Sequence, residues 1–266
     1  MSNNNIEELD SFGFPDLPNV RILSLSSNKI IKLNGSFFKK FENLEIIDLS
    51  NNEIDELDSF AFPEMPNVKI LSLGFNRITK INGSFFRKFE NLEIIDLSNN
   101  EIEELDSFAF PELPNVRIFS LSSNKIRKLN GSFFRKLENL EIIDLSNNEI
   151  EELDSFAFPE LPNVRILSLG FNRISSMNGS FFRIFENLEI IDLSNNEIDE
   201  LDSFTFPELP NVKILSLSSN KISSVEGRFF RNFENLEIID LSNNHIEEFE
   251  TFGFLDLPHL RILAFG

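Results

Sequence analysis

The sequence predicts an α/β repeat solenoid, a fold in which short similar units stack on one another around a continuous core. The template LxxLxLxxNxI recurs every 24 residues along the whole chain. A unit this short cannot bury its own apolar residues, so it must stack on its neighbours. The chain of 266 residues contains no linker and no break in composition. We therefore expect one domain over 1–266, made of about eleven 24-residue units without separate caps.

Each unit begins with a short strand, and the stretch LEIIDLSNN from Leu44 shows how its two faces are used. Successive side chains of a strand point to opposite faces. Ile47 and Leu49 therefore face the core, whereas Ile46 and Asp48 face outward. The template asparagine ends the strand, where a buried amide can bond to backbone groups of adjacent turns. It stands at Asn28, Asn52, Asn76, Asn100, Asn124, Asn148, Asn172, Asn196, Asn220 and Asn244.

The other side of each unit is expected to be mostly irregular. A phenylalanine keeps the same interval, from Phe14 and Phe38 through Phe62 to Phe254, and predicts a spine beneath this side. Alternate units carry FPELPN. Its prolines favour an extended or turn segment over a regular helix.

The repeat pattern resembles the leucine-rich-repeat family, in the 24-residue class common in animal extracellular receptors, over essentially the whole chain. The resemblance implies a right-handed horseshoe with a parallel sheet on its concave side. It also implies that outward strand positions contact partners. The class is typical of secreted or cell-surface proteins. Its ectodomains usually have cysteine-bearing end caps, whereas this chain contains no cysteine.

The units alternate between an acidic and a basic version, so the full repeat is a 48-residue pair. Equivalent side chains of neighbouring strands lie about 4.8 Å apart, where like charges destabilise a sheet. Here the residue after the first template position alternates in sign, from Arg21 and Glu45 to Lys69 and Glu93. Each exposed pair contributes only about 0–1 kcal/mol. We interpret the alternation as a device that fixes the stacking register.

Composition narrows the class of partner. The net charge of −20 argues against nucleic acid and anionic membranes, which both need a basic face. It favours a basic protein or peptide as the partner. No apolar run approaches the ~18 residues of a membrane span, and the polar N-terminus is no signal peptide. As written, the chain is expected in the cytoplasm.

No constellation of residues indicates catalysis. His245 and His259 lie far from any arranged serine or carboxylate pair, and no Gly-rich phosphate loop follows a strand. The stretch from Asp48 to Glu53 looks like the start of a calcium loop, but its sixth residue is Glu where that loop needs Gly. We expect no enzyme, no cofactor and no metal site.

The outward isoleucine of each strand is the main candidate for binding. A ladder of isoleucines at about 4.8 Å would form an apolar ridge for a peptide, a helix or another copy of the chain. The alternative is a β-branched ladder whose members cover one another and favour the strand. The candidate set is Ile46, Ile70, Ile94, Ile118, Ile142, Ile166 and Ile190, with the outward Asp96 and Asp144.

Two phenylalanines break the polar pattern before the template asparagine. Phe75 and Phe171 each follow a glycine and stand where other units carry Ser or Asn. Exposed aromatic side chains are effective binding anchors. The alternative is that each lies over its own glycine and that the 96-residue interval records a duplication.

The motif NGS occurs at Asn34, Asn82, Asn130 and Asn178. In a secreted protein these asparagines are acceptors for N-linked glycan. The alternative, favoured without a signal peptide, is turn chemistry in which Asn-Gly permits a positive φ.

Two functions from different classes remain. The first is a non-enzymatic protein-binding module that uses the concave face of the sheet. The second is a structural or designed repeat scaffold that mainly folds and associates with itself. Uncapped solenoid ends expose core residues and strand edges. They therefore predict a homo-oligomer formed through the ends.

Overall fold

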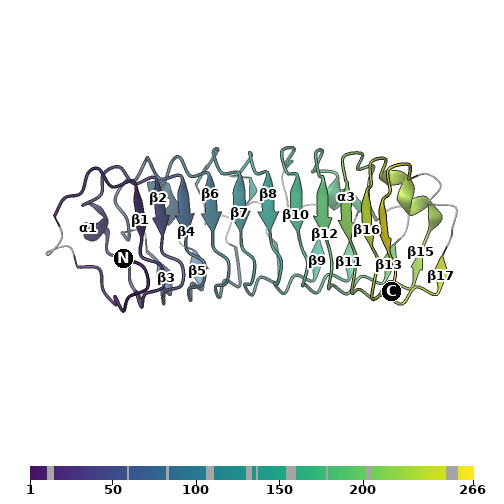
Figure 1. The fold of residues 1–266 in the computed structure, drawn as a ribbon, viewed down its shortest axis with the longest axis horizontal. Helices are drawn as coiled ribbons and strands as arrows, with labels where there is room; N and C mark the ends of the chain where they lie inside the picture. The colour runs from purple at the N-terminus through teal and green to yellow at the C-terminus, as the bar shows by residue number, and fades with distance from the viewer. Residues whose placement is uncertain are drawn as a thin grey trace. The chain divides into compact units, whose positions relative to one another are not determined.

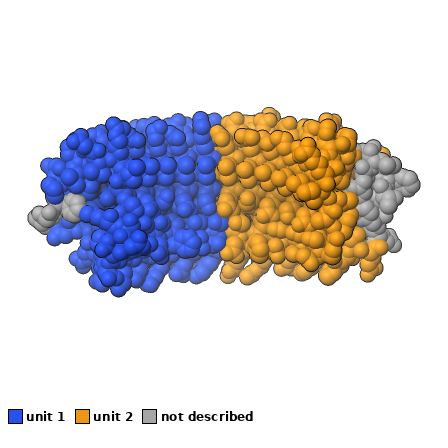
Figure 2. Space-filling model, in the orientation of Figure 1, with its two compact units in different colours: residues 1–126, 132–139 blue, residues 127–131, 140–266 orange. Residues whose placement is uncertain are grey.

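The computed structural model describes residues 1–10, 15–58, 60–81, 84–105, 111–129, 134–135, 137–153, 160–177, 179–201, 205–249 and 257–266. Its contacts divide the chain into two compact units, residues 1–126 with 132–139 and residues 127–131 with 140–266 (Figure 2). Each unit is a stack of 24-residue turns. The single domain over 1–266 stays a prediction.

Each turn contributes one three-residue strand to a parallel sheet (Figure 1). The strands pair in register, so that Ile46 lies opposite Ile70 and Ile47 opposite Leu71. The first unit holds β1 (Ile22–Ser24), β2 (Ile46–Asp48), β4 (Ile70–Ser72), β6 (Ile94–Asp96) and β7 (Ile118–Ser120). The second holds β8 (Ile142–Asp144), β10 (Ile166–Ser168), β12 (Ile190–Asp192), β14 (Ile214–Ser216), β16 (Ile238–Asp240) and β18 (Ile262–Ala264).

Burial along the strands follows the expected alternation. Ile47 and Leu49 are completely buried, whereas Ile46 and Asp48 are half-buried on the opposite face. The same alternation holds in β12, where Ile191 is buried. The predicted fold class, an α/β repeat solenoid with a parallel sheet and few helices, is confirmed.

Within the described residues, the outer side of the turns carries short elements only. Short helices are α1 (Gly35–Phe38), η1 (Phe85–Lys88), α3 (Gly179–Phe182) and η3 (Gly227–Asn232). Two-residue strands are β3 (Glu56–Leu57), β5 (Lys80–Ile81), β9 (Glu152–Leu153), β11 (Ser176–Met177), β13 (Glu200–Leu201), β15 (Ser224–Val225) and β17 (Glu248–Phe249). Beneath them the phenylalanine rings of successive turns meet, with centroids 4.1 Å apart for Phe38 and Phe62. Phe14 and Phe254 lie outside the described residues.

The template asparagines bind the turns together, and Asn100 shows how. Its Nδ2 donates to the carbonyl of Leu97 in its own turn and to that of Leu73 in the preceding turn, both at 3.0 Å. Its Oδ1 accepts the amide of Ile78 at 3.0 Å. The side chain is 7% exposed, so water cannot replace these bonds. One amide therefore satisfies buried backbone groups of two turns.

We expect Asn100→Ala to lower the free energy of unfolding by about 2 kcal/mol or more, because it leaves buried backbone groups without partners. Urea unfolding followed by circular dichroism measures the change. The matched control is Asn99→Ser, because serine occupies the equivalent position at Ser123. An unfolding midpoint unchanged by Asn100→Ala would contradict this account of the stacking.

Candidate functional site

The candidate isoleucines lie in register on the outward face of the sheet of each unit. Ile46, Ile70, Ile94 and Ile118 belong to the first unit, and Ile142, Ile166 and Ile190 to the second. All seven are half-buried. Ile22 and Ile262, in strands with one neighbour in the described part of the chain, are 64% and 52% exposed. Neighbouring isoleucines therefore cover one another, as the ladder alternative expects. Only part of each side chain is accessible to a partner.

The residue before each template asparagine has a left-handed backbone. Its φ lies between 54° and 57° at Asn3, Ser27, Asn51, Phe75, Asn99, Ser123, Asn147, Phe171, Asn195, Ser219 and Asn243. Asparagine tolerates this conformation because its short polar side chain can bond locally. Asn51, for example, donates through Nδ2 to Ser27 Oγ at 3.0 Å. The position thus suits small polar residues.

Phe75 and Phe171 depart from that pattern. Their φ angles are 56° and 57°, and their side chains are 59% and 58% exposed. A left-handed conformation costs a residue with a Cβ roughly 1–2 kcal/mol, and a large apolar group left in water recovers little of it. Backbone strain that burial does not offset is typical of functional positions.

The glycine before each phenylalanine leaves a space that side chains of the next turn border. A Cβ on Gly74 would lie 3.0 Å from both Asp96 Oδ2 and Ser98 Oγ. A Cβ on Gly170 would lie 2.9 Å from Asp192 Oδ2 and 3.0 Å from Ser194 Oγ. The structure therefore brings the predicted site residues Phe75 and Asp96 onto adjacent turns.

Asp144, the other carboxylate among the candidates, is held within its own turn. It accepts the amide and the hydroxyl of Ser146, with Oγ 2.7 Å from Oδ1. Asp48 has the same pair of bonds from Ser50. Burial would raise the pKa of Asp48, but hydrogen bonds from Ser50, Ser24 and Ser26 outweigh it and hold that pKa below its usual value.

Asn34, the one described member of the NGS set, is a helix cap. Its Oδ1 accepts the Ser36 amide at 3.0 Å at the start of α1, and its Nδ2 donates to the Leu9 carbonyl at 3.1 Å. Its φ is −120°, and no described glycine has a positive φ, so the positive-φ interpretation of Asn-Gly is wrong here. Gly35 is needed because a Cβ there would lie 2.4 Å from the Phe60 carbonyl oxygen. Asn82, Asn130 and Asn178 lie outside the described residues.

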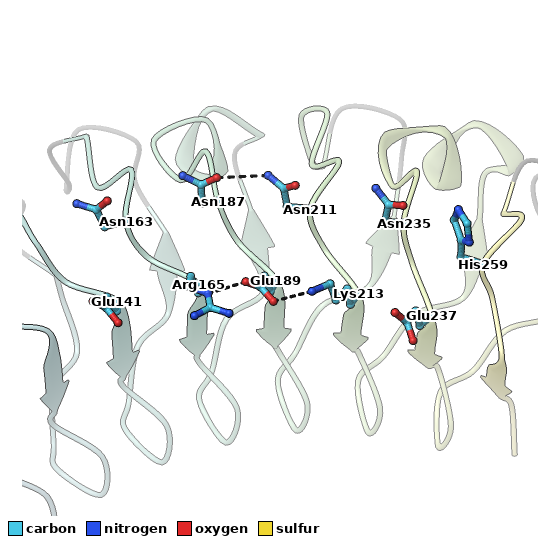
Figure 3. Close-up of a pocket in the computed structure, with 10 residues that line it drawn as sticks. All are labelled: Glu141, Asn163, Arg165, Asn187, Glu189, Asn211, Lys213, Asn235, Glu237 and His259. Carbon is cyan, nitrogen blue, oxygen red and sulfur yellow. Dashed lines mark hydrogen bonds and ion pairs between the residues drawn. The ribbon is translucent and has the colours of Figure 1, made fainter.

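A groove of about 510 Å³ runs along the second unit at the edge where the strands begin (Figure 3). One wall is a row of charges and the other a row of amides that ends at His259. The charged row is Glu141, Arg165, Glu189, Lys213 and Glu237, and the amide row is Asn163, Asn187, Asn211 and Asn235. A smaller groove of about 280 Å³ in the first unit repeats the arrangement around Lys69 and Asn91.

Both walls of this groove join successive turns. Glu189 pairs with Arg165 at 2.5 Å and with Lys213 at 2.8 Å. Hydrogen bonds from these two cations lower the pKa of Glu189 to about 2. In the other wall, Asn187 donates to the Pro162 carbonyl at 2.8 Å. The charged row follows from the alternating signs in the sequence. The amide row was not predicted, although the dipeptides PN and EN repeat at the same interval.

Within the described residues, no helix has the length and apolar character that a membrane span requires. The same residues contain no group of three or more His, Cys, Asp or Glu side chains that could hold a metal ion.

Comparison with known proteins gives matches by family and by fold. The leucine-rich-repeat family model matches residues 1–54, 18–67, 66–126, 114–174, 162–222 and 210–264. No curated protein sequence matches the chain.

Solved structures with this fold come from several assemblies. A chain of the Drosophila Toll–Spatzle complex matches with a TM-score of 0.79 and 25% identity, over 94% of this chain and 38% of that one. A chain of the octameric complex of Latrophilin 3, Unc5D and FLRT2 matches with a TM-score of 0.77 and 22% identity, over 94% and 75%. A leucine-rich-repeat protein of Leptospira interrogans matches with a TM-score of 0.76 and 24% identity, over 99% and 70%.

The ion pairs of Glu189 predict a pH-dependent contribution to stability. Because the folded-state pKa, about 2, lies below the ordinary 4.5, the pairs stabilise the fold above pH 4.5, and this stabilisation is lost as the pH falls towards 2. We therefore expect Glu189→Gln to lower the urea midpoint at neutral pH and low salt. Below pH 2, where this carboxyl is protonated in the folded and unfolded states, the two midpoints should coincide.

The matched control is Glu186→Gln, because the Glu186 side chain forms no ion pair within the described residues. Its midpoint should follow that of the unmodified chain at both pH values. An equal loss for Glu189→Gln at neutral and acidic pH would show that the carboxylate charge does not stabilise the stack.

Proposed function

The chain belongs to the leucine-rich-repeat family, and from this premise we propose that it is a non-enzymatic protein-binding module whose partner docks on the outward face of the strands. The supporting observation is the exposure of Phe75 and Phe171 in a left-handed backbone. The other described turns carry Asn or Ser at this position. No reaction is assigned to the chain.

The proposal explains why an unfavourable residue stands at this position. Aromatic side chains dominate binding energy in interfaces because they bury a large area with few rotatable bonds. The half-buried isoleucines of the same face, such as Ile70 and Ile94, add apolar area around such an anchor. Phe75 and Phe171 would then bury, against the partner, the apolar area that folding leaves exposed to water.

The partner proposed is a protein or peptide with basic character. The structures that the chain resembles include complexes with other proteins, among them the Toll–Spatzle complex. The net charge of −20 adds an attraction for a basic surface.

Selection from a random peptide library displayed on phage tests the proposal. The unmodified chain is the bait, and all recovered peptides are kept for comparison with the double variant Phe75→Asn, Phe171→Asn. Affinities of the recovered peptides are then measured with the purified chains. We expect the double variant to bind at least tenfold more weakly, a loss of about 1.4 kcal/mol. The same variant should unfold at higher urea concentration, because asparagine relieves the backbone strain.

The matched control is Phe60→Ser, which removes an 84% exposed phenylalanine from outside the strands. It should leave peptide affinity unchanged. Peptides that bind the double variant as tightly as the unmodified chain would overturn the proposed surface. A loss of stability in the asparagine variant would instead give the two phenylalanines a structural role.

We propose self-association as a second candidate function, because one edge strand presents apolar side chains. In β18, Ile262 and Leu263 are 52% and 39% exposed, and the adjacent Phe265 is 45% exposed. Phe265 also borders a hollow of about 340 Å³ with Leu241 and Ile246. An open strand edge beside an apolar hollow favours pairing with a second copy.

Light scattering behind size exclusion, over a wide concentration range, tests this second function. If self-association occurs, the mass rises above the 30.7 kDa of one chain as concentration increases. The double variant Leu263→Lys, Phe265→Lys should stay at one chain. Ile31→Lys, which changes a 45% exposed residue elsewhere, is the control and should still associate. A constant mass for the unmodified chain would rule the candidate out.

A further inference from the structure

A small polar cluster lies at the glycine that precedes each exposed phenylalanine. In the first unit it consists of Gly74, Asp96 and Ser98, and in the second of Gly170, Asp192 and Ser194. The backbone of each phenylalanine joins it to the cluster, because the Phe75 amide donates to the Ser98 carbonyl at 2.9 Å and the Phe171 amide to that of Ser194 at 2.8 Å. The chain therefore holds two copies of one arrangement.

The carboxylates of these clusters accept fewer hydrogen bonds than their counterparts. Asp48, Asp144 and Asp240 each accept both the amide and the hydroxyl of the serine two residues later. Asp96 and Asp192 accept only the amide, both at 2.9 Å, within the described residues. Each carboxylate therefore keeps acceptor capacity for a further donor.

The serine hydroxyls explain the difference. Where the preceding turn carries glycine, the hydroxyl lies against that glycine, 3.0 Å from the position of a Cβ at Gly74 or Gly170. Ser98 and Ser194 are only 9% and 8% exposed, whereas their counterparts Ser50 and Ser146 are half-buried. Neither hydroxyl has a hydrogen-bond partner in the described part of the chain.

These hydroxyls are not completely buried. Among the described residues, no completely buried polar side-chain atom lacks a partner, so both hydroxyls retain some contact with solvent. The carboxylate oxygen and the hydroxyl oxygen border the same space, because both lie about 3 Å from the position that a Cβ on the glycine would take. An exposed aromatic ring follows that glycine in the chain.

We propose that each cluster binds the guanidinium group of an arginine in the protein partner. This inference rests on the proposed function and names the side chain that the face recognises. A guanidinium has several donors in one plane, enough to engage a carboxylate and a hydroxyl together, and it stacks on aromatic rings. A lysine ammonium is a point charge and uses this geometry less well. The net charge of −20 favours the approach of a cation.

Selective 15N-glycine labelling tests the proposal, because the chain has only ten glycines and two of them are the cluster glycines. Acetyl-Gly-Arg-Gly-amide is titrated into the full chain at low salt. We expect saturable shifts of the Gly74 and Gly170 signals and none at Gly35. The same peptide with citrulline, which is neutral and has nearly the shape of arginine, should cause neither shift.

Matched variants locate the binding group. Asp96→Asn keeps an acceptor for the Ser98 amide but removes the charge, so the fold is retained. It should weaken the Gly74 response at least tenfold and leave the Gly170 response intact as an internal control. Asp144→Asn makes the same change in charge where the serine hydroxyl is already bonded, and should leave both responses unchanged.

Three outcomes would overturn the arginine site: equal shifts with citrulline, shifts at Gly35 as large as those at Gly74, or a Gly74 response that survives Asp96→Asn. If selected peptides bind through Phe75 and Phe171 but the arginine peptide shifts neither glycine signal, the arginine site is wrong and the proposed protein-binding face is retained. If no selected peptide depends on those phenylalanines while the glycine signals respond to arginine only, the cation site stands and the proposed function falls.

Discussion

The buried asparagine at the end of each strand is the interaction on which the rest of the structure depends. A turn of 24 residues exposes backbone groups to its neighbours on both sides. In the stack these groups must find partners or pay the cost of desolvation. The amide of Asn76 satisfies the carbonyls of Leu73 and Leu49 and the amide of Ile54. Because it spans two turns, it fixes their spacing and leaves the outward strand positions free to vary.

This spacing places equivalent side chains of successive turns next to one another on the outward face. The isoleucines mainly cover one another, so their ladder supports the sheet as much as it presents a surface. Turns differ from one another where a small polar residue is replaced, as at Gly74 and Phe75. One replacement exposes an aromatic ring, and the other draws the Ser98 hydroxyl away from Asp96. Two substitutions in one turn thus change the hydrogen bonding of the next.

The repeat period was enough to predict the fold, because strand alternation and the cost of unpaired backbone leave few ways to stack LEIIDLSNN. The candidate site was predictable only in part. Phe75 was noticed because other turns carry Asn or Ser at its position. Its left-handed backbone comes from the geometry of the turn and cannot be read from the residue type. The rearrangement of Ser98 depends on a glycine 24 residues earlier, and it appears only when the two turns are placed side by side. For the NGS motif, turn chemistry with a positive φ was the favoured alternative to glycosylation, whereas Asn34 has a φ of −120° and caps a helix.

The alternating charges also restrict how such a chain can change its length. Glu189 is flanked by Arg165 on one side and Lys213 on the other. Excision of a single turn would bring two side chains of like sign face to face, whereas excision of two turns would restore the sequence of signs. Gain or loss of turns by recombination between repeat units is therefore tolerated most readily in steps of 48 residues. The 96 residues between Phe75 and Phe171 are two such steps. An insertion of one step between them would keep the charge pattern but change the separation of the two exposed phenylalanines.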